Sequence, residues 1–109
     1  MILLNTTFSV DDAIADDFFD FLRRRYVPAA RRCGLGSPLL GKVRVDAERN
    51  FVTAGTSHSY ALQLLAPDSA AADAFVSGHQ LPLLAEMSAK WGPSVTYFCT
   101  ALDIVDSYK

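Results

Sequence analysis

Alternating side-chain types mark four segments of the chain as β-strands. Residues 2–10 place Ile2, Leu4, Thr6, Phe8 and Val10 on one side and Leu3, Asn5, Thr7 and Ser9 on the other. Successive side chains of a strand point to opposite faces of the sheet, so this segment has one apolar and one more polar face. The same period of two predicts strands over residues 37–48, 57–66 and 95–105.

Two longer segments carry apolar residues at helical spacing instead. The first follows Asp12 and places Ile14, Phe18, Phe21, Leu22, Tyr26 and Val27 on one stripe, with Gly34 as its terminator. Pro28 should kink or interrupt this helix, because proline cannot donate a hydrogen bond to the carbonyl of Arg24. The second helix is predicted from Pro67-Asp68-Ser69 to about Trp91, weakened at Gly78 and Pro82 and stopped by Gly92-Pro93.

The two helices begin with the same short pattern, which amounts to a half-repeat of the chain. Asp11, Asp16 and Phe18 recur as Asp68, Asp73 and Phe75, each 57 positions further on. We interpret both leading aspartates as helix caps and both phenylalanines as core residues. A β-α-β unit that occurs twice predicts an α+β, ferredoxin-like βαββαβ sandwich, in which two helices cover one face of a four-stranded antiparallel sheet. Residues 1–109 are expected to form one such domain.

The second sheet face, which no helix would cover, is where the sequence first bears on function. The residues expected on it are Leu3, Asn5, Thr7, Ser9, Lys42, Arg44, Ser59, Ala61, Gln63 and Leu65, completed by Tyr97 and Cys99 or else by Phe98 and Thr100. This face is too apolar to be left in water and too polar for an ordinary core. We therefore expect a homodimer in which two such faces pair as a dimeric α+β barrel.

The candidate ligand-binding residues are the hydrogen-bonding side chains of that face. Asn5, Thr7, Arg44 and Gln63 come from three strands, with Tyr97 from the fourth, and Arg44 could pair with a carboxylate. Together they could hold a small polar or anionic ligand. The commoner alternative is that these groups pair with one another across the dimer interface.

Other chemistry-bearing residues have simpler interpretations. His58 and His79 could act as general bases, but an exposed or core histidine is the simpler interpretation of both. No carboxylate is near His58 in sequence, and Asp103 or Asp106 would serve only if the fold brought them close. The arginine run at positions 23–25 and 31–32 could bind a phosphate or an acidic partner. We favour the simpler interpretation, a solvated helix face whose arginines pair with Asp16, Asp17 and Asp20.

Composition narrows the function further. A net charge of −2 gives no basis for nucleic-acid binding. The N-terminus lacks the basic residues of a signal peptide, and no apolar run could span a bilayer, so we expect a cytoplasmic protein. Cys33 and Cys99 are expected to be free thiols, and no residue spacing indicates a metal or cofactor.

Four short motifs resemble the landmarks of a known family over nearly the whole chain. They are Asn5-Thr6-Thr7-Phe8-Ser9-Val10-Asp11-Asp12, Tyr26-Val27-Pro28, Tyr60-Ala61-Leu62-Gln63 and Pro67-Asp68-Ser69-Ala70. They are similar to those of short bacterial proteins in family 4286 of the domains of unknown function. The resemblance implies a ferredoxin-like, dimeric α+β barrel fold and assigns no catalytic residue.

These observations favour a homodimeric module that binds a small molecule or a partner. The alternative is a cofactor-free enzyme, monooxygenase-like or isomerase-like, that acts in the barrel cavity. That alternative rests on fold analogy alone.

Overall fold

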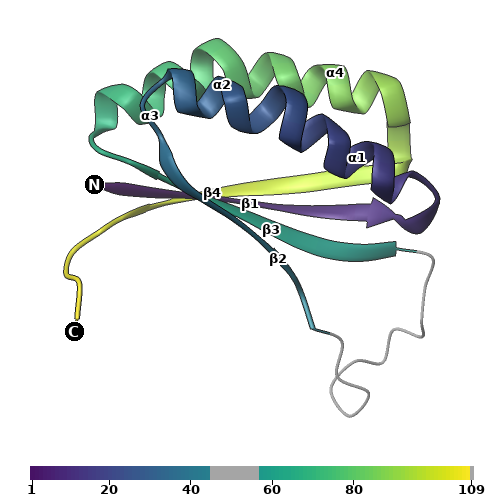
Figure 1. Cartoon of the computed structure of the whole chain (residues 1–109), viewed down its shortest axis with the longest axis horizontal. Coiled ribbons are helices and arrows are strands. Elements are labelled where there is room, and N and C mark those ends of the chain that lie inside the picture. Colours follow the sequence, from purple (N-terminus) through teal and green to yellow (C-terminus); the bar gives the residue numbers. More distant parts are fainter. Residues whose placement is uncertain (45–56, 109) are drawn as a thin grey trace.

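The computed structural model describes residues 1–44 and 57–108, which form one sheet with helices on one side (Figure 1). The strands are β1 (Ile2–Asp11), β2 (Gly36–Lys42), β3 (Ser57–Ala66) and β4 (Val95–Asp103). They are arranged in the order β2-β3-β1-β4, and every neighbouring pair is antiparallel. This confirms the ferredoxin-like arrangement that the half-repeat predicts. The predicted second strand ran to residue 48, and its end lies outside the described residues.

Each helical segment is divided by a single wide π-turn. The first comprises α1 (Ala15–Phe21), the π-turn η2 (Leu22–Tyr26) and α2 (Val27–Arg32), and it follows the short 3-10 turn η1 (Asp12–Ile14). The second comprises α3 (Ser69–Phe75), the π-turn η3 (Val76–Gln80) and α4 (Leu81–Trp91), and η4 (Gly92–Ser94) leads from it into β4. Gly34 and Gly92 follow the two segments with positive φ angles of 87° and 54°, as expected of glycines that end helices.

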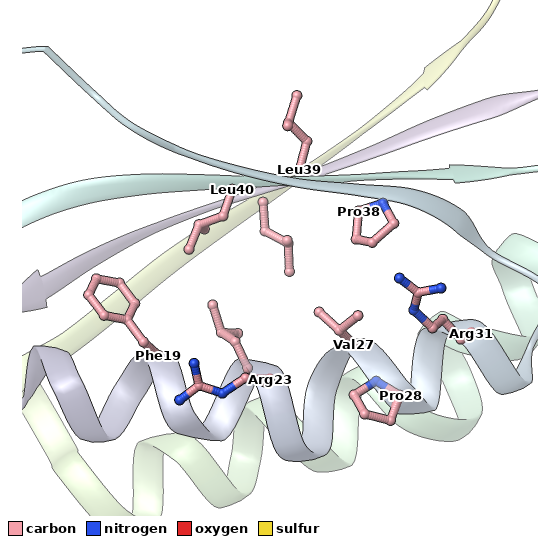
Figure 2. Close-up of a pocket in the computed structure, with 10 residues that line it drawn as sticks. Phe19, Arg23, Val27, Pro28, Arg31, Pro38, Leu39 and Leu40 are labelled. Carbon is pink, nitrogen blue, oxygen red and sulfur yellow. The ribbon is translucent and has the colours of Figure 1, made fainter.

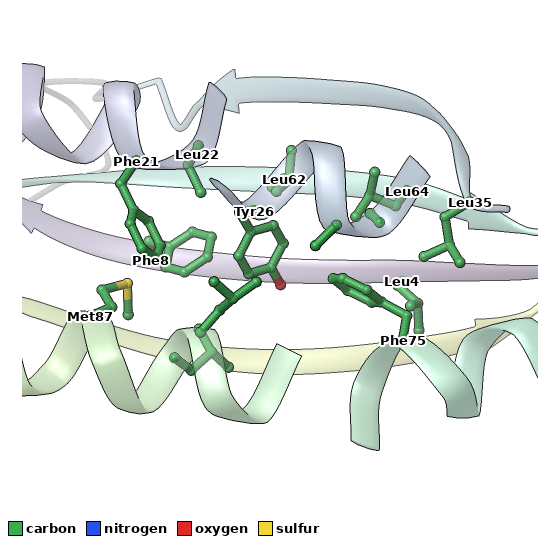
Figure 3. Packing of buried hydrophobic residues seen from close by; sticks show 14 of the residues in the cluster. Leu4, Phe8, Phe21, Leu22, Tyr26, Leu35, Leu62, Leu64, Phe75 and Met87 are labelled. Carbon is green, nitrogen blue, oxygen red and sulfur yellow. The ribbon is translucent and has the colours of Figure 1, made fainter. Parts of the chain in front are cut away.

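The half-repeat marks the scaffold, as predicted. Asp11 accepts a hydrogen bond from the backbone N–H of Ala13, and Asp68 accepts one from that of Ala71, at 3.3 and 2.8 Å. Both aspartates therefore cap the helical segments that follow them. Phe18 and Phe75 are fully buried between the helices and the sheet. Figure 3 shows Phe75 in this layer, close to Tyr26 and Leu4.

The prolines explain why both helices contain π-turns. Pro28 and Pro82 each lie two residues after the end of a π-turn, within the first turn of α2 and of α4. A proline deprives the preceding turn of one hydrogen bond and crowds its carbonyl, and a wider turn relieves that crowding. The interruptions predicted at Pro28 and near Gly78 are thus present, and they take the form of π-turns.

The π-turns place two polar residues in the core. Tyr26 ends η2 and Gln80 ends η3, and the Gln80 amide donates to the Tyr26 hydroxyl at 2.7 Å and to the Thr6 hydroxyl at 3.2 Å. Gln80 and Thr6 are the buried polar residues of the described chain, and no buried side-chain nitrogen or oxygen there lacks a partner. A satisfied polar cluster of this kind fixes the register of both helices on β1.

Replacing Gln80 tests this cluster. Gln80→Leu should lower the free energy of unfolding by roughly 2 kcal/mol, because the Tyr26 and Thr6 hydroxyls lose a buried partner. Ser88→Ala, at an exposed position of the same helical segment, should change it by less than ~0.5 kcal/mol. Urea denaturation at one protein concentration measures both values. Equal stability of Gln80→Leu and the parent protein would show that the cluster contributes nothing to the fold.

The buried Tyr26 hydroxyl should make the free energy of unfolding fall as the pH rises through the alkaline range. Burial raises the pKa of Tyr26 above its usual 10.0, although hydrogen bonds with Gln80 and Thr6 oppose the shift. The folded protein therefore keeps this proton to a higher pH than the unfolded chain does, and the stability contribution present below pH 10 declines above it. Between pH 8 and pH 11, urea denaturation should show that the free energy of unfolding falls more steeply for the parent than for Tyr26→Phe. Parallel pH curves for the two proteins would contradict this assignment.

Candidate functional site

The sheet face turned away from the helices, called the open face here, is built of four rows of side chains. Strand register sets the rows, and each crosses β3, β1 and β4 in turn. From one end to the other they are Leu65-Leu3-Leu102, Gln63-Asn5-Thr100, Ala61-Thr7-Phe98 and Ser59-Ser9-Thr96. Leu39 of β2 extends the second row and Gly41 the third. One amide row and one hydroxyl row therefore alternate with rows that carry leucine or phenylalanine.

Polar groups at the middle of this face are close enough to act on one molecule. The Asn5 amide donates to the Thr7 hydroxyl at 3.4 Å, and Gln63 lies directly opposite Asn5. Asn5, Thr7 and Gln63 are each half-buried. Beside them is a shallow hollow of about 170 Å³ lined by Thr7, Ser9, Ser59, Thr96, Tyr97 and Phe98. Neutral amides and hydroxyls can donate and accept hydrogen bonds, so this surface suits an uncharged polar group.

Arg44 does not belong to this group, which corrects the expectation from sequence. Lys42 lies opposite Tyr60, whose side chain is buried under the helices, so Lys42 projects from the helix side of the sheet. Arg44 follows β2 and lines a separate shallow pocket with Lys42, Val43 and His58. It is five residues beyond Leu39, the β2 member of the Asn5 row, which is roughly 16 Å along an extended strand.

The register also decides between the two alternatives for β4. Tyr97 lies opposite Phe8 and Cys99 opposite Thr6, and both partners are buried on the helix side. Phe98 and Thr100 therefore complete the open face. Tyr97 is also among the residues that line the hollow. Cys99 instead approaches the core cluster, with its sulfur 3.6 Å from the Thr6 hydroxyl. The predicted site thus keeps Asn5, Thr7 and Gln63 and gains Thr100 in place of Tyr97.

Exposed apolar side chains border the polar centre along both edge strands. Leu39 and Val43 are 66% and 50% exposed near β2, and Phe98 and Leu102 are 62% and 48% exposed on β4. Leu39 lies opposite Gln63. Val43 is four residues further along the chain and projects from the same side, which is the open face. An apolar border around a polar centre is typical of a surface that another molecule covers.

His58 and Asp12 form a close pair that the sequence did not reveal. His58 Nδ1 lies 2.6 Å from an oxygen of Asp12, although the two residues are 46 positions apart. The contact follows from the strand pairing, because His58 lies opposite Val10, and Asp12, two residues beyond Val10, is its diagonal neighbour on the same side. His58 pairs with Val10, which is buried on the helix side, so this pair is not part of the open face. Asp103 lies opposite Ile2, at the far end of β1.

Most arginines of the basic run have local carboxylate partners. Asp20 contacts Arg23 at 2.9 Å and Arg24 at 3.1 Å, and the hydrogen bond from Arg23 lowers the pKa of this carboxyl. Arg25 forms a two-pronged pair with Glu86 of α4, at 2.7 and 2.9 Å. Pairing within the same helix therefore holds for Arg23 and Arg24 through Asp20, whereas the partner of Arg25 is Glu86, which the sequence did not reveal.

Residues 1–44 and 57–108 contain neither a metal-binding cluster nor a membrane-spanning helix. No cluster of three or more histidine, cysteine, aspartate or glutamate side chains there could hold a metal ion. No helix of that part of the chain is both long enough and apolar enough to cross a membrane.

Comparison with known families identifies the chain. The model of the family described as Domain of unknown function (DUF4286) matches residues 1–105, so the protein belongs to this family. No curated protein matches the chain.

Solved structures share the fold at low identity. A dimeric ferredoxin-like protein from an uncultured marine organism is 13% identical, with a TM-score of 0.64 over 98% of each chain. HapK from Hahella chejuensis is 14% identical, with a TM-score of 0.63 over 100% of this chain and 98% of its own. The de novo designed protein Foldit4 is 7% identical, with a TM-score of 0.61 over 94% of this chain and 97% of its own. These similarities show the fold and nothing of the function.

The position of Arg44 can be checked in solution. In ¹H–¹⁵N correlation spectra, Arg44→Ala should shift the amide signals of Lys42 and His58. It should leave those of Asn5 and Gln63 unchanged, because their row is too far from Arg44. Thr100→Val should do the reverse, since Thr100 lies opposite Asn5. Large shifts of Asn5 and Gln63 in Arg44→Ala would restore the arginine to the open-face site.

Proposed function

We propose that this member of DUF4286 acts as a homodimer joined through the open face, and that the dimer binds a small polar molecule between its two sheets. The observation that carries the proposal is the composition of the open face. Leu39, Val43, Phe98 and Leu102 expose apolar surface along both edges, while amides and hydroxyls occupy the centre. Pairing two such faces removes the apolar edges from water, which is the main driving force for association.

Face-to-face pairing also turns the polar centre into a ligand site. Stacked sheets lie about 10 Å apart, which leaves room for side chains or for a small molecule between them. The amides of Asn5 and Gln63 and the hydroxyl of Thr100 would then be removed from bulk water. Buried polar groups need partners. A ligand rich in hydrogen-bonding groups can satisfy them, and so can the same row of a second protomer.

The four rows favour an uncharged ligand over an anionic one. Between Leu3 and Ser9 the rows contain no charged side chain. A carboxylate would therefore be desolvated there without a cationic partner, which costs several kcal/mol. The anionic option depended on Arg44, which lines a different pocket. The enzyme alternative needs an acid or base inside the barrel, and no observation on these rows favours it.

A charge on the open face should break the dimer. Phe98→Asp should convert a dimer to a monomer in sedimentation equilibrium, with the dissociation constant raised by at least a hundredfold, because two carboxylates would be placed between the sheets. Leu81→Asp is the matched control. Leu81 is similarly exposed, at 57%, but it lies in α4 on the opposite side of the sheet.

Comparing Phe98→Asp with Leu81→Asp shows whether the dimer forms through the open face or through another surface. The proposal requires the parent and Leu81→Asp to be dimers and Phe98→Asp to be a folded monomer by circular dichroism. A parent protein that is monomeric at micromolar concentration, or a dimer that survives Phe98→Asp, would overturn it.

A further inference from the structure

A second cavity lies on the helix side of the sheet, between the first helical segment and edge strand β2. It has a volume of about 440 Å³, which is in the range of small-molecule pockets. Figure 2 shows Phe19 and Val27 on the helix facing Leu40 and Pro38 on β2. Leu22 and Leu62, both buried, complete the lining. The cavity is called the β2 groove below.

The groove follows from the irregular start of β2. Its pairing with β3 slips between Gly36 and Leu39, and Ser37 has a positive φ of 52°. Pro38 offers no N–H to a neighbouring strand, which suits an edge position. This irregularity turns Leu40 towards the helix, whereas Leu39 points to the opposite side of the strand (Figure 2). The strand therefore forms an apolar wall beside the helix.

Arg23 and Arg31 lie at the rim of this apolar groove, and they differ in their carboxylate partners. Arg23 is held by Asp20 at 2.9 Å. Arg31 has no carboxylate partner among the described residues. In Figure 2 its guanidinium lies in the space between the helix and Pro38. An apolar slot with one available guanidinium at its mouth complements a molecule that has an apolar chain and an acidic head.

We infer that the β2 groove binds an amphipathic carboxylate, with its chain between Val27 and Leu40 and its head on Arg31. The inference is independent of the proposed dimer, because the groove and the open face are on opposite sides of the sheet. The chain of the ligand removes apolar side chains from water, and the carboxylate can accept two parallel hydrogen bonds from the guanidinium. The rim is exposed, so salt should weaken binding.

Octanoate is a suitable probe, and titration calorimetry can measure its binding. The parent should bind octanoate, while octanol, which lacks the charge, and acetate, which lacks the chain, should bind at least tenfold more weakly. Arg31→Gln should weaken octanoate binding about tenfold, because a charged hydrogen-bond donor is lost. Arg32→Gln is the matched control, since Arg32 is also exposed but lines a different pocket, with Glu86. It should bind octanoate as the parent does.

Amide shifts locate the bound probe. Octanoate should shift the signals of Val27 and Leu40 and leave those of Thr7 and Thr100 unchanged, and the same two signals should shift in Phe98→Asp. Shifts confined to the open face would overturn the inference, as would equal affinities of Arg31→Gln and Arg32→Gln. Groove signals that move with protein concentration alone would show that a second copy of the chain covers the groove, which also excludes the inference.

Discussion

The unequal covering of the sheet's two faces is the constraint on which the rest of the structure depends. Both helical segments lie on one side of four strands (Figure 1). That side buries an almost continuous apolar layer from Leu4 to Val10 on β1 and from Tyr60 to Ala66 on β3. The other side has no layer of its own chain in the described residues. Its rows are therefore free to combine amides, hydroxyls and exposed leucines, a combination that a helix-covered core would not tolerate.

A single buried carboxamide links the two helical segments to the sheet. The Gln80 side chain connects Tyr26 of the first helical segment to Thr6 at the centre of β1. Gln80 is the last residue of the π-turn η3, and each helical segment has such a π-turn shortly before a proline. The two prolines thus help to specify the fold. They favour the wide turns that bring the Tyr26 hydroxyl and the Gln80 amide together. A regular α-helix through the same residues would rotate the following turns relative to the sheet.

The sequence predicted what depends on local pattern and missed what depends on pairing. The local signals are the alternation along the strands, the helix caps at Asp11 and Asp68, and the glycines that end the helices. The structure confirms the caps and the glycine terminators. The face of β2 is different. We predicted Lys42 and Arg44 on the open face, but the register of β2 with β3, which slips near Ser37 and Pro38, turns that side towards the helices. Arg44 was therefore assigned to the wrong pocket. The contact of His58 with Asp12 was missed for the same reason, since it exists only through the register of β1 with β3.

The two proposed sites differ in chemistry but share one structural element. The open face offers neutral hydrogen-bonding groups between apolar edges, whereas the β2 groove offers apolar walls with a guanidinium at the rim. Leu39 faces one surface and Leu40 the other, so β2 contributes to both (Figure 2). An edge strand held on one side only is the part of a sheet most easily displaced. If filling the groove shifts β2, thermodynamic linkage requires that dimerisation change the affinity of the groove by the same factor. The coupling would then reside in β2, and its size would be measured by comparing octanoate affinity in the parent with that in the monomeric Phe98→Asp variant.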